Sequence, residues 1–265
     1  MSGFEAFILG LVQGLTEFLP VSSSGHLTIA KHLFGIETGD LTFEILVHAA
    51  TVLATIVVFR KEIWDLLQGL FKFKYNVQTR YVAMICISMI PVLIVGVFFK
   101  DKVEALFGSG LTVVGCALLL TAALLMLGEW LSSRRNAPEG EMNYKTAAWM
   151  GLAQAMAVIP GLSRSGSTIA AGLMCGTKRS EVAQFSFLMV LVPIFGEAFL
   201  DLVGGDMAAS SGIGTWPLVI GFLSAFISGM FACKVMIDLV KKAKLKWFAL
   251  YCVIVGIACL FNFFM

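Results

Sequence analysis

The chain has 265 residues, of which 58% are hydrophobic and 14% charged, and its mean hydropathy is +0.90. These values lie outside the usual range of soluble domains, so the composition predicts a polytopic membrane protein. The formal net charge of +2 is too small to indicate a nucleic-acid-binding protein, and we expect no nucleic-acid partner. The six cysteines have no Cys-x-x-Cys spacing, which indicates buried thiols rather than a metal site or a disulfide framework.

The first predicted element, residues 3–19, is an apolar helix that carries Glu17 near its end. Pro20 blocks its continuation, and a Ser-Ser-Ser-Gly turn at 22–25 leads into a short apolar piece at 27–34. Two half-length helices around such a loop indicate a re-entrant hairpin, which requires a loop that is buried in protein or lines a wet cavity. Three spans are predicted to follow, at residues 43–59, 81–99 and 111–131.

A polar linker at 132–145 separates this half of the chain from a similar second half. The next apolar helix, 146–159, would be about 21 Å long and is too short for a hydrocarbon core of about 30 Å. The segment 160–168 breaks this helix, and a short apolar piece returns at 169–175, which predicts a second hairpin. Three further spans are predicted at residues 184–203, 216–237 and 247–265.

The two halves also agree residue by residue at one offset. Because each half has an odd number of spans, the second copy is expected to be upside down in the membrane, with broken helices that meet near the midplane. The predicted fold is therefore an all-α polytopic membrane protein with an inverted-topology repeat, each half a re-entrant helical hairpin plus three transmembrane helices. We expect one membrane domain, 1–265, with a first repeat at 1–131 and a second at 146–265. The pairs that differ by 141 positions are Gly10/Gly151, Leu11/Leu152, Gln13/Gln154, Ser22/Ser163, Ser24/Ser165 and Gly25/Gly166.

Lysine and arginine gather in alternate polar segments of the chain. They are frequent between the first two spans, in the linker and before the last span, whereas 100–104 is balanced by acidic residues and 204–215 has none. Because cytoplasmic loops carry an excess of Lys and Arg, the basic segments predict the cytoplasmic side. Both termini would then lie outside, and the first hairpin would enter from the outer side. The basic residues are Arg60, Lys61, Lys72, Lys74, Arg80, Arg134, Arg135, Lys145, Lys241, Lys242, Lys244 and Lys246.

The first hairpin carries an unusual set of polar residues for a membrane segment. Gln13 and Glu17 are spaced i, i+4 and therefore share one helix face. An intramembrane carboxylate indicates a functional site, and the alternative is a Glu at a wet interface. The hydroxyls of residues 22–24 and the backbone at Gly25 could bind an anion at a helix N-terminus, or Ser22 could serve as an ordinary N-cap. His26 could be a base, an acid, a nucleophile or a metal ligand, or a hydrogen-bonded structural residue.

The second hairpin contributes Arg164, whose fork of donors suits a phosphate group. The alternative is that Arg164 is a counter-ion to Glu17, because intramembrane charges tend to pair. Together the two hairpins match phosphate-ester or anhydride chemistry on an amphipathic substrate, with a divalent cation, Mg²⁺ or Ca²⁺, bound by Glu17 and Gln13. The residues predicted to complete an anion cradle beside Arg164 are Ser163, Ser165, Ser167 and Thr168.

Two stretches resemble the signature motifs of the bacterial undecaprenyl-diphosphatase family, also called bacitracin resistance proteins. The first is Gln13-x-x-x-Glu17 followed by Pro20-Val-Ser-Ser-Ser-Gly-His26, and the second is Pro160-Gly-x-Ser-Arg-Ser-Gly-x-Thr168. The resemblance extends over essentially the whole chain in length, motif spacing and order of apolar segments. It implies a bacterial inner-membrane enzyme that hydrolyses the C55 polyprenyl diphosphate to the monophosphate carrier and inorganic phosphate, with its site facing the outer side.

The resemblance also implies roles for individual residues. Glu17 matches the acidic residue needed for metal-dependent activity, and Gln13 stands where the family accepts Glu or Gln. The proposed catalytic and phosphate-binding positions of the family fall on Ser22, Ser23, His26 and Arg164. Three attacking groups fit the sequence: Ser23 activated by His26, His26 itself, and a metal-bound water.

Four other polar residues in or near the spans, His48, Glu129, Glu197 and Asp201, are interpreted as packing or hydrogen-bonding residues, although His48 and Glu197 could line a cavity. The main functional alternative is a polyprenyl-phosphate flippase or another secondary transporter, because inverted repeats with broken helices are the usual architecture of that class. The expected partners are the polyprenyl diphosphate and membrane lipids, and a homodimer is left open.

Overall fold

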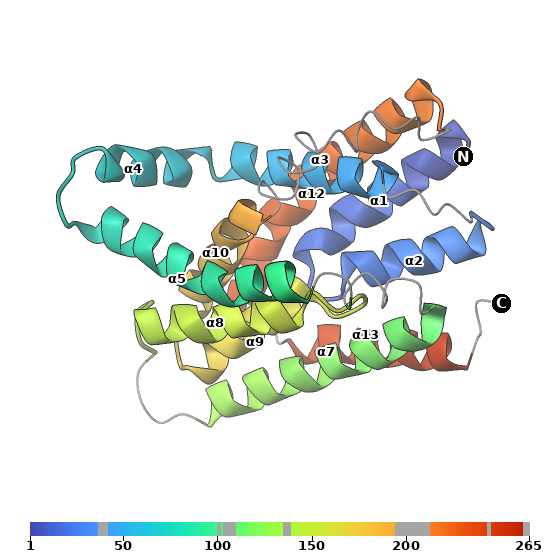
Figure 1. Ribbon diagram of the computed structural model, residues 1–265. Helices are drawn as coiled ribbons and strands as arrows, with labels where there is room; N and C mark the ends of the chain where they lie inside the picture. Colours follow the sequence, from blue (N-terminus) through green and yellow to red (C-terminus); the bar gives the residue numbers. More distant parts are fainter. Residues whose placement is uncertain are drawn as a thin grey trace.

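The computed structural model describes residues 1–36, 42–99, 102, 110–134, 139–193, 213–242 and 245–261. The regular elements in these residues are all α-helices, which confirms the predicted all-α class (Figure 1). The first half contains α1 (Gly3–Phe18), α2 (Ser23–Leu33), α3 (Thr42–Val58), α4 (Arg60–Leu70), α5 (Val77–Phe98) and α7 (Gly110–Ser133). The second half contains α8 (Tyr144–Met156), α9 (Arg164–Met174), α10 (Arg179–Met189), α12 (Thr215–Lys242) and α13 (Lys246–Leu260).

Several of these helices are long and apolar enough to cross a membrane. Among the described residues, α5, α7 and the part Thr215–Leu239 of α12 meet this criterion singly, and α3 and α4 meet it as a bent pair. The protein is therefore a multi-pass membrane protein, and the predicted spans 43–59, 81–99, 111–131 and 216–237 are confirmed as helices. The shorter α13 covers most of the predicted span 247–265. The predicted span 184–203 begins in α10, and its continuation beyond 193 lies outside the described residues.

The connection after the first predicted span contains a helix that the sequence analysis did not predict, α4, which begins at Arg60. Its apolar side chains follow helical spacing, with Ile63 and Leu66 packed against the core and Trp64 and Leu67 exposed. Charged residues between them lower the mean hydropathy, so the segment does not read as a span although it is a good amphipathic helix. The chain bends by 74° between α3 and α4.

Both predicted hairpins are present. In the first, α1 ends before Pro20, and Ser22 caps α2 with its hydroxyl, which accepts a hydrogen bond from the Gly25 amide at 3.2 Å. In the second, Ser163 caps α9 in the same way. Gly161 has a φ of +85°, and a Cβ there would lie 2.8 Å from Val114 Cα, so the turn of this hairpin requires glycine.

The tips of the two hairpins touch each other inside the helix bundle. The Gly161 amide donates to Ser24 Oγ at 3.4 Å, and Ser165 Oγ donates to the Leu19 carbonyl at 3.0 Å. At Gly25 a Cβ would lie 3.3 Å from Gly161 Cα, so the small residue allows this close approach. Two broken helices therefore meet through their loops, and each loop is covered by the other half of the chain.

Helices of the first half pack mainly on helices of the second half. The first broken helix, α1, packs on α12, and its counterpart α8 packs on α5, as Figure 1 shows, while α7 and α13 pack on each other. Gly10 and Gly151, which correspond at the offset of 141, both lie against a backbone carbonyl of the other half. A Cβ at Gly10 would lie 2.3 Å from Gly221 O, and one at Gly151 would lie 2.4 Å from Ser88 O. The arrangement is consistent with the predicted repeat; its inversion across the membrane stays a prediction.

Candidate active site

The carboxylate of Glu17 is the centre of a polar cluster inside the bundle, and its side chain is 8% exposed. Oε1 accepts a hydrogen bond from Arg164 Nη2 at 2.7 Å. Oε2 accepts from Ser23 Oγ at 2.6 Å and from Gln13 Nε2 at 2.9 Å. His48 Nε2 lies 3.7 Å from the same oxygen. The structure thus gathers residues from both hairpins and from α3 around one buried charge.

Local folding explains why these groups meet. Gln13 and Glu17 lie one turn apart in α1 and share a face, as the i, i+4 spacing predicts. Ser23 is the first residue of α2, and Arg164 is the first residue of α9. The amino ends of both helices therefore lie beside the carboxylate, and their dipoles favour negative charge there.

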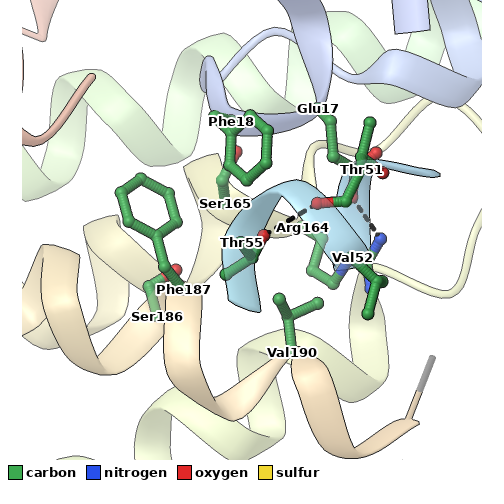
Figure 2. Close-up of a pocket in the computed structure, with 10 residues that line it drawn as sticks. All are labelled: Glu17, Phe18, Thr51, Val52, Thr55, Arg164, Ser165, Ser186, Phe187 and Val190. Atoms are coloured by element: carbon green, nitrogen blue, oxygen red, sulfur yellow. Dashed lines mark hydrogen bonds and ion pairs between the residues drawn. The ribbon is translucent and has the colours of Figure 1, made fainter. Parts of the chain in front are cut away.

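A small cavity opens beside the ion pair between Glu17 and Arg164 (Figure 2). Its volume of about 20 Å³ has room for about one water molecule. Hydroxyls and aromatic rings both line it, so a charged end adjoins an apolar wall. The residues that line the cavity are Glu17, Phe18, Thr51, Val52, Thr55, Arg164, Ser165, Ser186, Phe187 and Val190.

Arg164 is held as the counter-ion to Glu17, the arrangement considered as its alternative role. Its side chain is 26% exposed, whereas that of Glu17 is nearly buried. A guanidinium has five N–H donors, and the bond to Glu17 Oε1 engages one of them. Pairing with Glu17 therefore does not use up the capacity of Arg164 to bind an anion.

His26 lies to one side of the cluster. Its Nδ1 is 2.7 Å from the Ser22 carbonyl oxygen, and its Nε2 is 2.7 Å from the hydroxyl of Tyr251 in α13. Ser23 directs its hydroxyl to Glu17 instead. In this arrangement the hydroxyl of Ser23 has a carboxylate, rather than the imidazole, as its hydrogen-bond acceptor.

The residues predicted to bind the anion have different roles in the structure, and several of them stabilise the helix ends and the hairpin contact. Ser22 and Ser163 cap helices, Ser24 accepts from the amide of the opposite hairpin, and Thr168 Oγ1 lies 2.7 Å from Ser186 Oγ. Ser165 lines the cavity and also donates to a backbone carbonyl. The hydroxyl of Ser167 is buried, without a hydrogen-bond partner among the described residues.

Sequence reasoning missed several residues that the structure places near the cluster. His48 was interpreted as a packing or hydrogen-bonding residue, with a place in the lining of a cavity as the alternative, and its Nε2 lies 3.7 Å from Glu17 Oε2. Thr51, Ser186 and Tyr251 are ordinary residues of apolar helices, and no pattern singles them out.

The structural interpretation of Glu129 is confirmed. Its Oε2 accepts hydrogen bonds from Arg179 Nη2 at 3.0 Å and from the Leu245 amide at 3.3 Å, and these bonds join α7 to the starts of α10 and α13. Glu197 and Asp201, interpreted in the same way, lie outside the described residues.

The donor atoms of the cluster fit a hard divalent cation. Gln13 Oε1 is buried and has no hydrogen-bond partner among the described residues. Together with the Glu17 carboxylate and Ser23 Oγ it offers oxygen ligands, the type that Mg²⁺ and Ca²⁺ prefer. Within the described part of the chain no group of three or more His, Cys, Asp or Glu side chains could hold a metal. A cation here would therefore take its other ligands from water or from phosphate oxygens, as Mg²⁺ commonly does.

Comparisons with known proteins show the family of the chain. Residues 6–258 match the family model described as bacitracin resistance protein BacA. A protein of Bacteroides fragilis named undecaprenyl-diphosphatase is 58% identical over 261 residues, and the match covers 97% of each chain. Proteins of the same name from Parabacteroides distasonis and Carboxydothermus hydrogenoformans are 58% and 40% identical, with at least 97% of each chain covered. The chain therefore belongs to the bacitracin resistance protein BacA family.

Proposed function

We propose that this protein hydrolyses undecaprenyl diphosphate to undecaprenyl phosphate and inorganic phosphate, and thereby recycles the lipid carrier for synthesis of cell-wall polymers. The observation that carries the proposal is the buried Glu17–Arg164 pair, which brings the two broken helices together beside the Ser23 hydroxyl. Relatives that share 58% of their residues with this chain over nearly its full length are named for this activity.

The charges of the cluster suit a diphosphate. Arg164 binds a phosphate group through the donors that Glu17 leaves unused. The amino ends of α2 and α9 contribute further positive potential. Because the cavity holds about one water molecule, we expect the side chains that line it to move apart when the diphosphate binds.

A divalent cation is part of this proposal. Glu17, Gln13 and Ser23 would hold it, and it would neutralise part of the charge of the diphosphate. The chain itself orients the substrate. Phe18 and Phe187 form an apolar wall beside the charged end of the cavity, and such a wall favours the prenyl end of the lipid over water.

The geometry favours Ser23 or a water molecule beside Glu17 as the attacking group. If Ser23 attacks, its oxygen bonds to the terminal phosphorus, the bond from that phosphorus to the bridging oxygen breaks, and the hydroxyl proton passes to Glu17. Water then hydrolyses the phosphoserine to inorganic phosphate. Both ring nitrogens of His26 have partners other than Ser23, so His26 does not activate that hydroxyl. We assign His26 to the second step, in which Nε2 takes up the proton of the water that hydrolyses the phosphoserine.

We further propose that the protein lies in the inner membrane with the site facing the outer side and both termini outside. The support is the charge distribution between alternate loops. The meeting of two broken helices also keeps a lipid flippase as the second candidate function, because secondary transporters build their sites in this way. A flippase would need Arg164 and the helix ends but no attacking group at Ser23.

The test is phosphate release from undecaprenyl diphosphate by the detergent-purified full chain, with and without EDTA. We expect release that stops in EDTA and returns with Mg²⁺, and that is abolished in Glu17→Gln and His26→Ala. Glu5→Gln is the matched control, because Glu5 lies on the same helix and only caps its start. A folded chain that releases no phosphate with any divalent cation contradicts the proposal, and lipid translocation in vesicles then tests the flippase.

A further inference from the structure

His26 and Tyr251 come from distant parts of the chain and form a close pair beside the first hairpin. The Tyr251 hydroxyl lies 2.7 Å from His26 Nε2, and the two positions are 225 residues apart. Their rings stack with centroids 5.6 Å apart and planes 9° from parallel. One contact fixes the position of the imidazole, and the other fixes its rotation.

The backbone of Ser22 decides which nitrogen of His26 carries the proton. Nδ1 lies 2.7 Å from the Ser22 carbonyl oxygen, and a carbonyl oxygen can only accept, so Nδ1 is the donor. In the neutral ring Nε2 then carries the lone pair. Nε2 is therefore the ring atom that can take up a proton, and it is the atom that Tyr251 contacts.

A tyrosine hydroxyl suits an imidazole that changes its protonation state. It donates to Nε2 while the ring is neutral, and it accepts from Nε2–H once the ring has gained a proton, because a hydroxyl is both donor and acceptor. The contact with His26 is thus kept in both states. Tyr251→Phe would keep the stacked ring and would lose the hydrogen bond in both protonation states of His26.

Tyr251 is not needed to pack its helix. The face of α13 that is buried consists of Ala249, Cys252, Gly256 and Cys259, and α13 packs on α7. Tyr251 itself is 42% exposed. Its hydroxyl therefore reaches His26 from a side chain that lies outside the buried face of α13.

We propose that Tyr251 is a positioning residue of the active site, which holds the imidazole of His26 in the orientation for proton transfer at Nε2. This inference rests on the proposed phosphatase function. It assigns Tyr251 a role through His26, since the structure shows its hydroxyl on the imidazole and not on a phosphate-binding group.

The first test is spectroscopic and needs no substrate. Long-range ¹H–¹⁵N correlation spectra of the ¹⁵N-histidine-labelled chain resolve three imidazoles, and His26→Gln identifies the signal of His26. We expect His26 to show a protonated Nδ1 and a hydrogen-bonded, unprotonated Nε2. Tyr251→Phe should shift the Nε2 resonance of His26. The Nδ1 resonance should stay unchanged, because Nδ1 remains hydrogen-bonded to the Ser22 carbonyl. An Nε2-protonated tautomer in the unsubstituted chain, or no change at Nε2 in the variant, would overturn the proposal.

The second test separates kcat from KM. Because a hydrogen bond of this type is worth about a factor of ten, Tyr251→Phe should lower kcat about tenfold and leave KM within about twofold. Tyr75→Phe is the matched control, since it removes a hydroxyl that lies 3.2 Å from Tyr144 OH, outside the site. Unchanged kcat in Tyr251→Phe would contradict the positioning role. An unsubstituted chain that releases no phosphate contradicts the proposed function instead, and the spectra still decide whether Tyr251 binds Nε2 of His26.

Discussion

Arg164 Nη2 lies 2.7 Å from Glu17 Oε1, and this ion pair joins two residues that are 147 positions apart. Each charge sits where one of the two broken helices meets its loop. Removing both charges from water is costly, so the pair requires good geometry and further hydrogen bonds. Glu17 has these bonds from Ser23 and Gln13. A phosphate group that binds the remaining donors of Arg164 adds a second negative partner to the guanidinium.

Arg164→Lys tests whether the shape of the guanidinium matters as well as its charge. Lysine keeps the pairing with Glu17 but is a point charge without the planar fork that binds two phosphate oxygens. We expect kcat/KM for the diphosphate to fall about 100-fold, because the loss of a charge-assisted bond is worth about 1.5–3 kcal/mol. The midpoint of thermal unfolding in detergent should change little.

Two variants control this experiment. Arg60→Lys makes the same exchange at an exposed arginine whose Nη1 donates to the Val57 carbonyl, and it should leave kcat/KM unchanged. Arg164→Ala leaves the buried Glu17 charge unpaired and should lower the unfolding midpoint, since breaking a buried pair costs about 3–5 kcal/mol. Full activity in Arg164→Lys would contradict a bidentate phosphate contact.

Ser23→Ala tests the hydroxyl that donates to Glu17. If this hydroxyl attacks phosphorus, its loss should lower kcat by more than about 100-fold, because a nucleophile cannot be replaced by a methyl group. Thr28→Ala is the control on the same helix, as Thr28 Oγ1 donates to the carbonyl of Ser24. Trapping with acid during turnover should yield a phosphoserine in the unsubstituted chain and none in Ser23→Ala. Near-normal kcat in Ser23→Ala would leave water beside Glu17 as the attacking group.

The sequence predicts the parts of this site that are local in the chain. Pro20 and Gly161 mark the breaks of the two hairpins, and the i, i+4 spacing places Gln13 beside Glu17. His48 and Tyr251 reach the site only through tertiary packing, which local spacing does not encode. The sequence also leaves open whether the hydroxyls of Ser22 and Ser163 cap a helix or bind an anion, because both roles place a serine at a helix N-terminus. The helix α4 escaped prediction because an amphipathic segment has too little hydropathy to read as a span.

Gly10→Ala and Gly151→Ala test the packing between the two halves. Both added methyl groups would press on a backbone carbonyl, which cannot rotate away as a side chain can. Overpacking of this kind costs about 1–3 kcal/mol, so we expect each variant to lower the midpoint of thermal unfolding. The control is Gly96→Ala in α5, where a Cβ would meet nothing within 4 Å. That variant should be neutral or slightly stabilising, because alanine favours helix more than glycine does. Equal effects of all three substitutions would contradict tight packing at Gly10 and Gly151.

Gln13→Glu tests the proposed cation site through a position that carries an amide in this chain. The substitution would place a second carboxylate beside Glu17 in a buried setting, where like charges repel unless a cation lies between them. We therefore expect Gln13→Glu to unfold at a lower temperature than the unsubstituted chain in EDTA, and to regain stability when Mg²⁺ is added. The Mg²⁺ concentration for half-maximal activity should fall about tenfold, since each added anionic ligand strengthens the hold on a hard cation.

Gln154→Glu provides the matched control for that cation site. Gln154 corresponds to Gln13 at the offset of 141 and is equally buried, but Val158 stands where the first repeat has Glu17. In Gln154→Glu the new carboxylate has no acidic neighbour in its own motif with which to bind a cation. The substitution should therefore lower the midpoint of thermal unfolding by the same amount in EDTA and in Mg²⁺. Recovery by Mg²⁺ in Gln154→Glu as large as in Gln13→Glu would mean that the ion acts on buried carboxylates in general. Recovery of stability by Mg²⁺ in Gln13→Glu alone would assign the cation to the Glu17 cluster. The two variants bury the same carboxylate in equivalent helices, and one turn further on the first helix has Glu17 where the second has Val158.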